Sequence, residues 1–210
     1  MPTTPRATPR LTRAETQART RAKLLATATT CFLRDGYADT SLEGVAAAAG
    51  FTKGAVYSNF SSKVQLCQAV LDAIRAERIA ALGRAVTGAA TVDALAAALE
   101  RWADQHIGDP AWTRLEVEFG VHASRVPALA RQVAKRHQEV RRQVGALIAS
   151  YAAAHGLTLP LPADELGVAM LSLGVGLGVQ RAIDPTLPVR SLASSLRLLA
   201  APPPATARRR

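Results

Sequence analysis

TSLEGVAAAAGFTKGAVYSNFSSK, residues 40–63, is the stretch of this 210-residue chain that decides its fold. Thr40 precedes Glu43 by three positions, which is the spacing of a capping box at a helix N-terminus. Gly50 then ends this helix, because glycine enters the left-handed conformation without steric cost, and Thr52 caps a second short helix. Two short helices joined by a tight glycine turn are the layout of a helix-turn-helix, whose second helix enters the DNA major groove.

The second of these helices carries small and polar residues that suit a DNA-reading surface. Lys53 lies in its first turn, where free backbone amides and the helix dipole favour an anion. Gly54 and Ala55 have almost no side chain, so the backbone can approach base edges or a thymine methyl group closely. Spacing alone leaves open the alternative of a capped helical corner with a polar outer face.

The residue types decide between these alternatives. The run GFTKGAVYSNFSSK, residues 50–63, resembles the N-terminal DNA-binding motif of the TetR family of bacterial transcriptional repressors. In that motif a small residue, a Lys or Arg, a glycine, an aliphatic residue, an aromatic residue, two polar residues and a phenylalanine follow one another, and a lysine comes two or three residues later. The upstream run Asp35-Gly36-Tyr37 also fits, and the resemblance covers residues 19–71.

The resemblance implies a homodimer that binds a pseudo-palindromic operator in double-stranded DNA, with one reading helix from each protomer. Some side chains would grip phosphates and set the register, and others would face the bases. The phosphate contacts are expected from Thr40, Ser41, Tyr57 and Lys63. The residues expected to face the bases are Lys53, Gly54, Ala55, Ser58 and Asn59, and Thr52 completes the predicted DNA-binding set.

Charge and composition point the same way. The net charge of +10 indicates a polyanionic partner. Residues 1–63 carry nine Lys or Arg against four Asp or Glu, and three arginines stand at 208–210, so the basic residues gather at the predicted DNA-binding end and at the C-terminal tail. No segment of useful length alternates apolar and polar residues as a strand does, so we predict an all-α fold.

We expect about nine helices in two domains. A three-helix helix-turn-helix DNA-binding domain covers residues 14–61, and its first helix spans residues 14–34. Residues 62–200 form a connecting helix and a larger helical-bundle C-terminal domain for ligand binding and dimerisation, as the family resemblance implies. Residues 1–13 and 201–210 are expected to be a disordered basic arm and tail. The arm is either solvated or follows the DNA into the minor groove.

Several classes of site and location are disfavoured. Cys31 and Cys67 lie on apolar helical faces without metal-ligand neighbours, so neither a disulfide framework nor a metal site is predicted, and redox sensing is the alternative reading. The N-terminus lacks the apolar core of a secretory signal, and the longest apolar run, residues 166–179, is shorter than a bilayer span. We expect a cytoplasmic protein without membrane contact and without a cofactor.

The larger domain carries aromatic and histidine side chains on apolar stripes. A pocket with aromatic walls and a few polar groups suits a small, mostly apolar effector with a polar handle. Each histidine on such a stripe has the alternative of being a satisfied core residue. The candidate effector-binding residues are Trp102, His106, Trp112, Glu116, Phe119 and His122.

A helix expected at residues 163–183 has glycines along one face. A bare face lets another helix approach closely, either from the partner protomer or within the chain. The resemblance implies that the last two helices form the dimer interface. The candidate dimerisation residues are Gly167, Met170, Gly174, Gly178, Leu192 and Leu196.

Together these patterns predict a ligand-responsive DNA-binding transcriptional regulator, specifically a repressor that a small, mostly apolar effector releases from its operator. Two alternatives stay open: an effector-independent DNA-binding protein of the same fold, and an all-helical enzyme. No nucleophile elbow, paired carboxylates or His/Glu cluster of zinc-binding type occurs in the sequence, so we expect no enzymatic activity.

Overall fold

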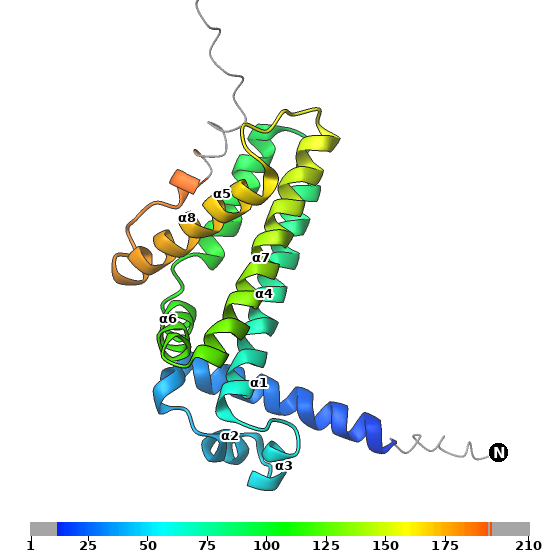
Figure 1. Cartoon of the computed structure of the whole chain (residues 1–210), viewed down its shortest axis with the longest axis vertical. Coiled ribbons are helices and arrows are strands. Elements are labelled where there is room, and N and C mark those ends of the chain that lie inside the picture. The colour runs from blue at the N-terminus through cyan, green and yellow to red at the C-terminus, as the bar shows by residue number, and fades with distance from the viewer. Residues whose placement is uncertain (1–11, 193, 195–210) are drawn as a thin grey trace, which may run out of the picture. The chain divides into compact units, whose positions relative to one another are not determined.

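Helices make up the regular structure of residues 12–192 and 194, the part of the chain that this computed structural model describes (Figure 1). They are α1 (Arg13–Asp39), α2 (Leu42–Ala49), α3 (Lys53–Tyr57), α4 (Lys63–Thr87), α5 (Val92–His106), α6 (Pro110–Ser124), α7 (Pro127–Ala154) and α8 (Ala163–Ile183). Residues 190–192 are helical again and begin a ninth segment. No strand occurs in this described part, which confirms the predicted all-α fold. Leu196, residues 1–11 and the tail at 201–210 lie outside it.

The chain divides into two compact units, Met1–Asp72 and Ala73–Arg210, and the division falls inside α4. The sequence placed the boundary earlier, between residues 61 and 62. The first turns of α4 belong to unit 1 because they bury Leu66, Cys67 and Val70. One continuous helix therefore contributes to both units.

One apolar face of α2 is buried in unit 1. Its buried residues are the four that the three- and four-residue spacing predicts: Leu42, Val45, Ala46 and Ala49. Gly50 ends the helix in the left-handed conformation, with φ 71° and ψ 32°, as predicted. The N–H of Phe51 donates to the carbonyl of Ala46 at 2.9 Å, which closes the tight turn that leads to α3.

α1 is longer at both ends than the sequence predicted. A capping box opens it: the N–H of Glu15 donates to Thr12 Oγ1 at 3.2 Å, and the N–H of Thr12 donates to Glu15 Oε2 at 2.7 Å. The helix extends to Asp39 through a break at Gly36, where φ is 80° and ψ is −178°. Only glycine readily adopts that backbone conformation.

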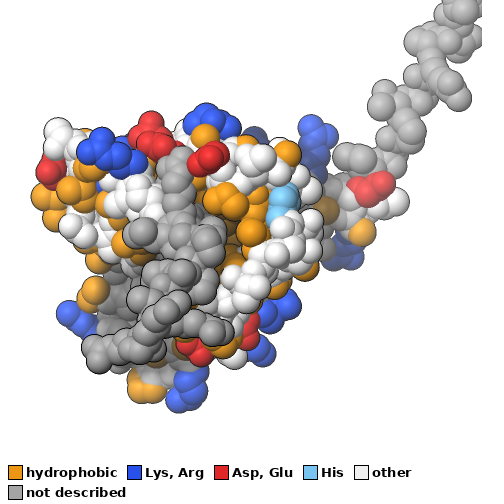
Figure 2. Space-filling model, turned by 90° about the horizontal axis from the view of Figure 1, so that it is seen from above, with side chains coloured by type: hydrophobic (Ala, Val, Ile, Leu, Met, Phe, Trp, Pro, Cys, Tyr) orange, Lys and Arg blue, Asp and Glu red, His pale blue; other side chains and the backbone are white. Residues whose placement is uncertain are grey.

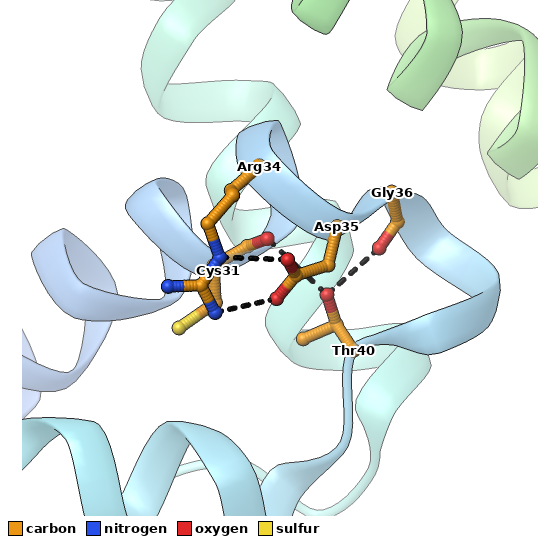
Figure 3. A network of polar contacts seen from close by, with 5 residues as sticks. All are labelled: Cys31, Arg34, Asp35, Gly36 and Thr40. Atoms are coloured by element: carbon orange, nitrogen blue, oxygen red, sulfur yellow. Dashed lines mark hydrogen bonds and ion pairs between the residues drawn. The ribbon is translucent and has the colours of Figure 1, made fainter.

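The capping box predicted between Thr40 and Glu43 is wrong. Ser41 is the N-cap of α2, since its Oγ accepts a hydrogen bond from the N–H of Gly44 at 3.0 Å. Thr40 is only 4% exposed, and its hydroxyl lies 2.7 Å from the carbonyl oxygen of Gly36 and 3.4 Å from that of Cys31 (Figure 3). Thr40 therefore closes the end of α1 instead of opening α2.

In unit 2 the backbones of α7 and α8 are in close contact. A Cβ atom placed on Gly167 would lie 2.8 Å from the main-chain oxygen of Arg141, a distance that real Cβ atoms do not reach. On the same face of α8, Cβ atoms on Gly174 and Gly178 would lie 3.8 Å from atoms of Ile107. The glycine face of α8 is thus occupied within the chain, which was the alternative to a dimer contact.

The other described dimerisation candidates also pack inside unit 2. Leu192 is buried in a cluster with Ala103, Leu177 and Val189, and the half-buried Met170 packs against it. A different face of α8 carries the exposed apolar side chains Val168, Val175, Val179 and Ile183, and the exposed Leu173 lies apart from them around the helix. This face is hereafter called the exposed α8 face.

α8 has 21 residues, more than the apolar run recognised in the sequence. Within the described part of the chain it is the one helix whose length and composition would suffice to cross a bilayer. Core helices of water-soluble proteins have the same length and composition, so this property alone does not assign α8 to a membrane.

Candidate nucleic-acid interface and cavity

α3, the second helix of the motif, presents most of its predicted DNA-reading side chains to solvent. Thr52 is its N-cap, as predicted, and its Oγ1 accepts from the N–H of Ala55 at 3.3 Å. Val56 is fully buried and fixes the inner face of the helix. Tyr57 is 46% exposed although it is aromatic. The remaining exposed residues of the predicted set here are Thr52, Lys53, Gly54 and Ser58.

Lys53 is held by an acidic residue of the preceding helix. Its Nζ lies 2.5 Å from Glu43 Oε1, and it lies 5.7 Å from the centroid of the Tyr57 ring. The ion pair raises the pKa of Lys53 and lowers the pKa of Glu43. The lysine ammonium therefore stays charged and stands at the exposed surface between α2 and α3.

Two further residues of the predicted set use their polar atoms inside unit 1. Asn59 Nδ2 donates to the carbonyl of Ala55 at 2.8 Å, so the amide closes the end of α3. Lys63 Nζ donates to the carbonyl of Ala38 at 2.8 Å and lies 4.7 Å from the Tyr37 ring centroid. Both side chains brace the motif in this structure.

Thr40 and Ser41, the two expected phosphate contacts that precede α2, differ in exposure. Ser41 is exposed and caps the helix. The Thr40 hydroxyl is buried and hydrogen-bonded within the chain, as described above. The phosphate contact expected from Thr40 stays a prediction, and if this hydroxyl made it, a buried hydrogen bond would have to break.

Two basic residues of α1 have contacts that the sequence did not reveal. The Arg21 guanidinium lies 4.1 Å from the Phe60 ring centroid, and its Nη1 donates to the carbonyl of Asn59. Lys23 Nζ lies 5.1 Å from the ring centroid of Phe51. These aromatic rings stand just before and just after α3, so the two cations connect α1 to both ends of the reading helix. Arg21 and Asn59 are 38 residues apart, so no local sequence signal marks the contact.

Unit 2 contains a cavity of about 1120 Å³. Its walls come from α4, α5, α6, α7 and α8, and most of its lining is aliphatic or aromatic. Seen from above, hydrophobic side chains gather beside a histidine at the surface of the molecule (Figure 2). A volume of this size fits a small molecule.

One end of the cavity is charged. Arg75 Nη2 donates to Glu116 Oε1 at 3.0 Å and lies 3.4 Å from His137 Nε2. Arg78 donates from Nη1 to the carbonyl of His106 at 2.9 Å. The two guanidinium carbons lie 5.8 Å and 4.5 Å from the ring centroid of Trp112. Residues from three helices and one helix end thus meet at this charged end.

The protonation state of His137 follows from its partner. A guanidinium only donates hydrogen bonds, so His137 Nε2 accepts and the imidazole is neutral. Burial lowers the pKa of His137, and the nearby Arg75 and Arg141 lower this pKa further against the opposing effect of Glu116. Burial also lowers the pKa of Arg78, which is only 18% exposed in its side chain.

The opposite end of the cavity is apolar. Leu95, Leu99 and Tyr151 are buried there with Ala89, and Leu82, Val86 and Leu157 pack against them. The Tyr151 hydroxyl is buried without a hydrogen-bond partner in the described structure. Burial raises the pKa of Tyr151, so the phenol stays neutral.

The structure brings four of the six predicted effector-binding residues to the cavity wall: Trp102, His106, Trp112 and Glu116. Phe119 and His122 are not among its lining residues; Phe119 is buried and His122 is half-buried. The sequence missed Arg75, Arg78, His137 and Arg141, which line the charged end. Nothing local marks these four residues, because they lie on long helices with many other basic residues.

Comparison with known proteins covers both units. Residues 24–70 match the family described as "Bacterial regulatory proteins, tetR family", and residues 91–201 match that described as "BetI-type transcriptional repressor, C-terminal". The HTH-type transcriptional regulator TtgR of Pseudomonas putida is 40% identical over 52 residues. This match spans 25% of the chain and a quarter (25%) of the length of TtgR.

Solved structures share the fold over nearly the whole chain. A TetR-family transcriptional regulator from Pectobacterium atrosepticum is 25% identical with a TM-score of 0.65, covering 92% of this chain and 100% of its own. A protein from Rhodococcus sp., also described as a TetR-family regulator, has a TM-score of 0.73 at 19% identity and covers 88% of this chain and 100% of its own.

Proposed function

The chain belongs to the TetR family of bacterial transcriptional regulators, and from this premise we propose that it is a repressor which a small, mostly apolar molecule releases from its DNA operator. The DNA-binding part of this proposal is supported by α3, which is capped and largely exposed. Ser41, Lys53 and Tyr57 are among the residues that combine exposure with a group suited to DNA.

When DNA approaches, the Glu43 carboxylate and the DNA phosphates would compete for the Lys53 ammonium. Its ammonium already touches Glu43, so a phosphate or a base acceptor must replace that carboxylate. The small surface of Gly54 lets the backbone come close to the bases beside it. Asn59 and Lys63 act mainly by holding the helix in position, because both donate to backbone carbonyls of unit 1.

The cavity supports release by an effector. Its volume of about 1120 Å³ and its mostly apolar wall favour an effector-responsive regulator over an effector-independent DNA-binding protein of the same fold. Arg75 and Arg78 of the cavity wall lie on α4, the same helix that begins in the DNA-binding unit. A ligand shifts DNA affinity only if it binds the non-operator conformation more tightly, typically by about 1–3 kcal/mol.

We propose that the protein works as a cytoplasmic homodimer that pairs through the exposed α8 face. Its valine and isoleucine side chains would be covered by the partner, which accounts for a helix this apolar on a protein surface. Three of them, Val168, Val175 and Val179, also line the cavity, so the partner would lie next to it. The glycine face is not needed for this contact, because it packs inside the chain. Two reading helices then fit half-sites about one DNA turn, ~34–36 Å, apart or more.

Selection from random duplex DNA tests the proposal. The purified full-length chain should enrich a sequence with two-fold symmetry, and the affinity measured by fluorescence anisotropy should fall steeply with salt. Tyr57→Ala, with a surface change away from α3 such as Arg142→Gln as control, should lose this binding while the dimer remains intact. Enrichment of no sequence contradicts the DNA-binding role, and equal binding by both variants removes Tyr57 from the DNA-binding surface. A thermal-shift screen of chemically diverse compounds, followed by operator release, tests effector control separately.

A further inference from the structure

The charged end of the cavity has more positive than negative groups. Three guanidinium groups line it, from Arg75, Arg78 and Arg141. Among the described lining residues Glu116 is the one carboxylate, and it is bound to Arg75 at 3.0 Å. Asp109 approaches Arg78 at 3.6 Å from the start of α6 but does not line the cavity.

Arg141 has no anionic partner within the described part of the chain. It is half-buried, and no carboxylate there lies within ion-pair distance of it. The positive charge of Arg141 lowers the pKa of the neighbouring His137. The adjacent Arg142 is exposed and is bound by Glu139 at 2.6 Å, so the two neighbouring arginines differ in burial and in pairing.

The arginine side chains at the charged end are partly shielded from water, which strengthens their interaction with an anion. The side chains of Arg75 and Arg78 are only 13% and 18% exposed. Charged hydrogen bonds are stronger in such surroundings than in water, and a guanidinium binds carboxylate or phosphate oxygens through paired donors. An anion at this end would accept hydrogen bonds from guanidinium N–H groups that have too few acceptors within the protein.

The ring of Trp112 at the charged end is already covered by two cations. Trp112 has the guanidinium groups of both Arg75 and Arg78 within 5.8 Å of its ring centroid. A cationic ligand would have to displace one of them and would meet the remaining positive charges. The charged end therefore selects against ammonium groups as well as for anions.

The apolar end lies along the same helices at a distance. α4 carries Arg75 at the charged end and Val86 at the apolar end, about 16 Å apart at the rise of an α-helix. α7 runs beside it in the same direction, with His137 near Arg75 and Leu147 3.8 Å from a Cβ atom placed on Gly83. The cavity is thus elongated, with charge at one end and aliphatic wall at the other.

We propose that the cavity takes an amphipathic monoanion, whose acidic head group binds Arg141 together with the Arg75–Arg78 pair and whose apolar body reaches toward Val86 and Leu99. This inference rests on the proposed effector function and specifies the chemical class of the effector. The acidic head group supplies hydrogen-bond acceptors to Arg141, and the apolar body of the ligand is taken out of water by the aliphatic wall of the cavity.

Three probes with one apolar body and different heads test the charge preference: decanoate, decanol and decylamine, the last of which is protonated at neutral pH. Isothermal titration calorimetry with the full-length protein, below the concentration at which the probes form micelles, gives each Kd. We expect decanoate to bind at least about tenfold more tightly than either other probe, because a hydrogen bond to a charged group in a desolvated site is stronger than one to a neutral group.

Adjacent arginines supply the matched variants. Arg141→Gln should weaken decanoate binding about tenfold or more and leave decanol binding within about twofold, whereas Arg142→Gln should change neither. Arg141→Lys retains the charge and should keep the preference for decanoate even if Arg141→Gln unfolds. Equal binding of the three probes, preference for decylamine, no binding of any probe, or equal effects of Arg141→Gln and Arg142→Gln would overturn the proposal.

Operator binding is measured on the same samples so that the two proposals fail separately. A protein that binds its selected operator but shows no preference for decanoate retains the regulatory function and loses the proposed effector class. A protein that prefers decanoate but enriches no DNA sequence retains the anion site and loses the function as a repressor.

Discussion

Lys53 and Glu43 form an ion pair between the reading helix α3 and the helix that precedes it, with 2.5 Å between Nζ and Oε1. Both side chains are more than half exposed, so the pair lies at the surface that would face DNA. The positive charge expected to meet DNA is therefore engaged with a carboxylate before DNA arrives.

Glu43→Gln should raise operator affinity by a factor below about ten, because exposed ion pairs are weak and only this one must break when Lys53 turns to DNA. Asp39→Asn removes an equal charge from an exposed residue of α1 and serves as the control. Anisotropy titrations at several salt concentrations separate the two variants. A gain of equal size in both would assign the effect to general charge repulsion and not to release of Lys53.

Tyr57→Ala should lower operator affinity about tenfold or more with little change in thermal stability, because an aromatic ring that is 46% exposed contributes little to the core. Tyr57→Phe is the matched variant and keeps the ring. A loss in Tyr57→Phe as large as in Tyr57→Ala identifies the hydroxyl as the contact. Unchanged affinity in both removes Tyr57 from the interface.

Thr40→Val should lower the free energy of unfolding of unit 1 by about 1–3 kcal/mol, since it leaves the carbonyl of Gly36 without its 2.7 Å hydrogen bond in a buried place. Thr30→Val, at an exposed threonine of the same helix whose hydroxyl lies 3.4 Å from the carbonyl of Ala26, is the control and should cost much less. Urea unfolding followed by circular dichroism measures both. The operator affinity of folded Thr40→Val should be unchanged. A large loss of operator affinity with normal stability would instead support a phosphate contact from Thr40.

Gly167→Ala should destabilise unit 2 by about 1–3 kcal/mol, because the new methyl group would lie 2.8 Å from the main-chain oxygen of Arg141. Gly176→Ala lies on the same helix with no atom within 4 Å of the new Cβ, and it should be neutral or stabilise by up to about 1 kcal/mol. Thermal unfolding compares them directly. Destabilisation of similar size in both would contradict the close contact between α7 and α8.

The stability of unit 2 should fall as the pH drops below about 6.5, the ordinary pKa of histidine. The pKa of His137 is lowered in the folded protein, so the unfolded chain binds the proton first and is stabilised relative to the folded chain as the pH falls toward the folded-state pKa. Burial is the main cause of the lowered pKa, and the charged groups that act on it are Arg75 on α4, Glu116 on α6 and Arg141 on α7. In His137→Asn this part of the pH dependence should disappear, which thermal unfolding between about pH 7.5 and about pH 5 can measure. An unchanged pH profile in the variant would contradict a lowered pKa.

Local signals predicted most of the helices. α8 begins and ends where the sequence placed it, because Pro162 precedes it and the Asp184-Pro185 pair follows it. Gly50 and Thr52 were identified as caps for the same reason, since a cap depends on residues only a few positions away. Boundaries failed where a break lies inside a helix, as at Gly36 in α1.

The cavity shows the limit of such reasoning. Aromatic residues on apolar stripes led to four of its wall residues, but the charged end joins Arg75 to Glu116 across 41 residues and to His137 across 62. Periodicity tells that a residue lies on an inner face. It does not tell which residue of another helix lies opposite.

Thr12 and Thr40 show the difference between a local effect and a tertiary one. Thr12–Glu15 and Thr40–Glu43 have the same Thr-x-x-Glu spacing, yet the first pair forms a capping box and the second does not. The sequence by itself determined the helices, their caps near glycine and proline, and the DNA-binding motif, because these depend on neighbouring residues. The tertiary structure decided which threonine caps, which acid holds Lys53 and which arginines meet in the cavity. The physical reason is that a buried hydroxyl or charge takes the partner that packing brings within hydrogen-bond distance, wherever that partner lies in the chain.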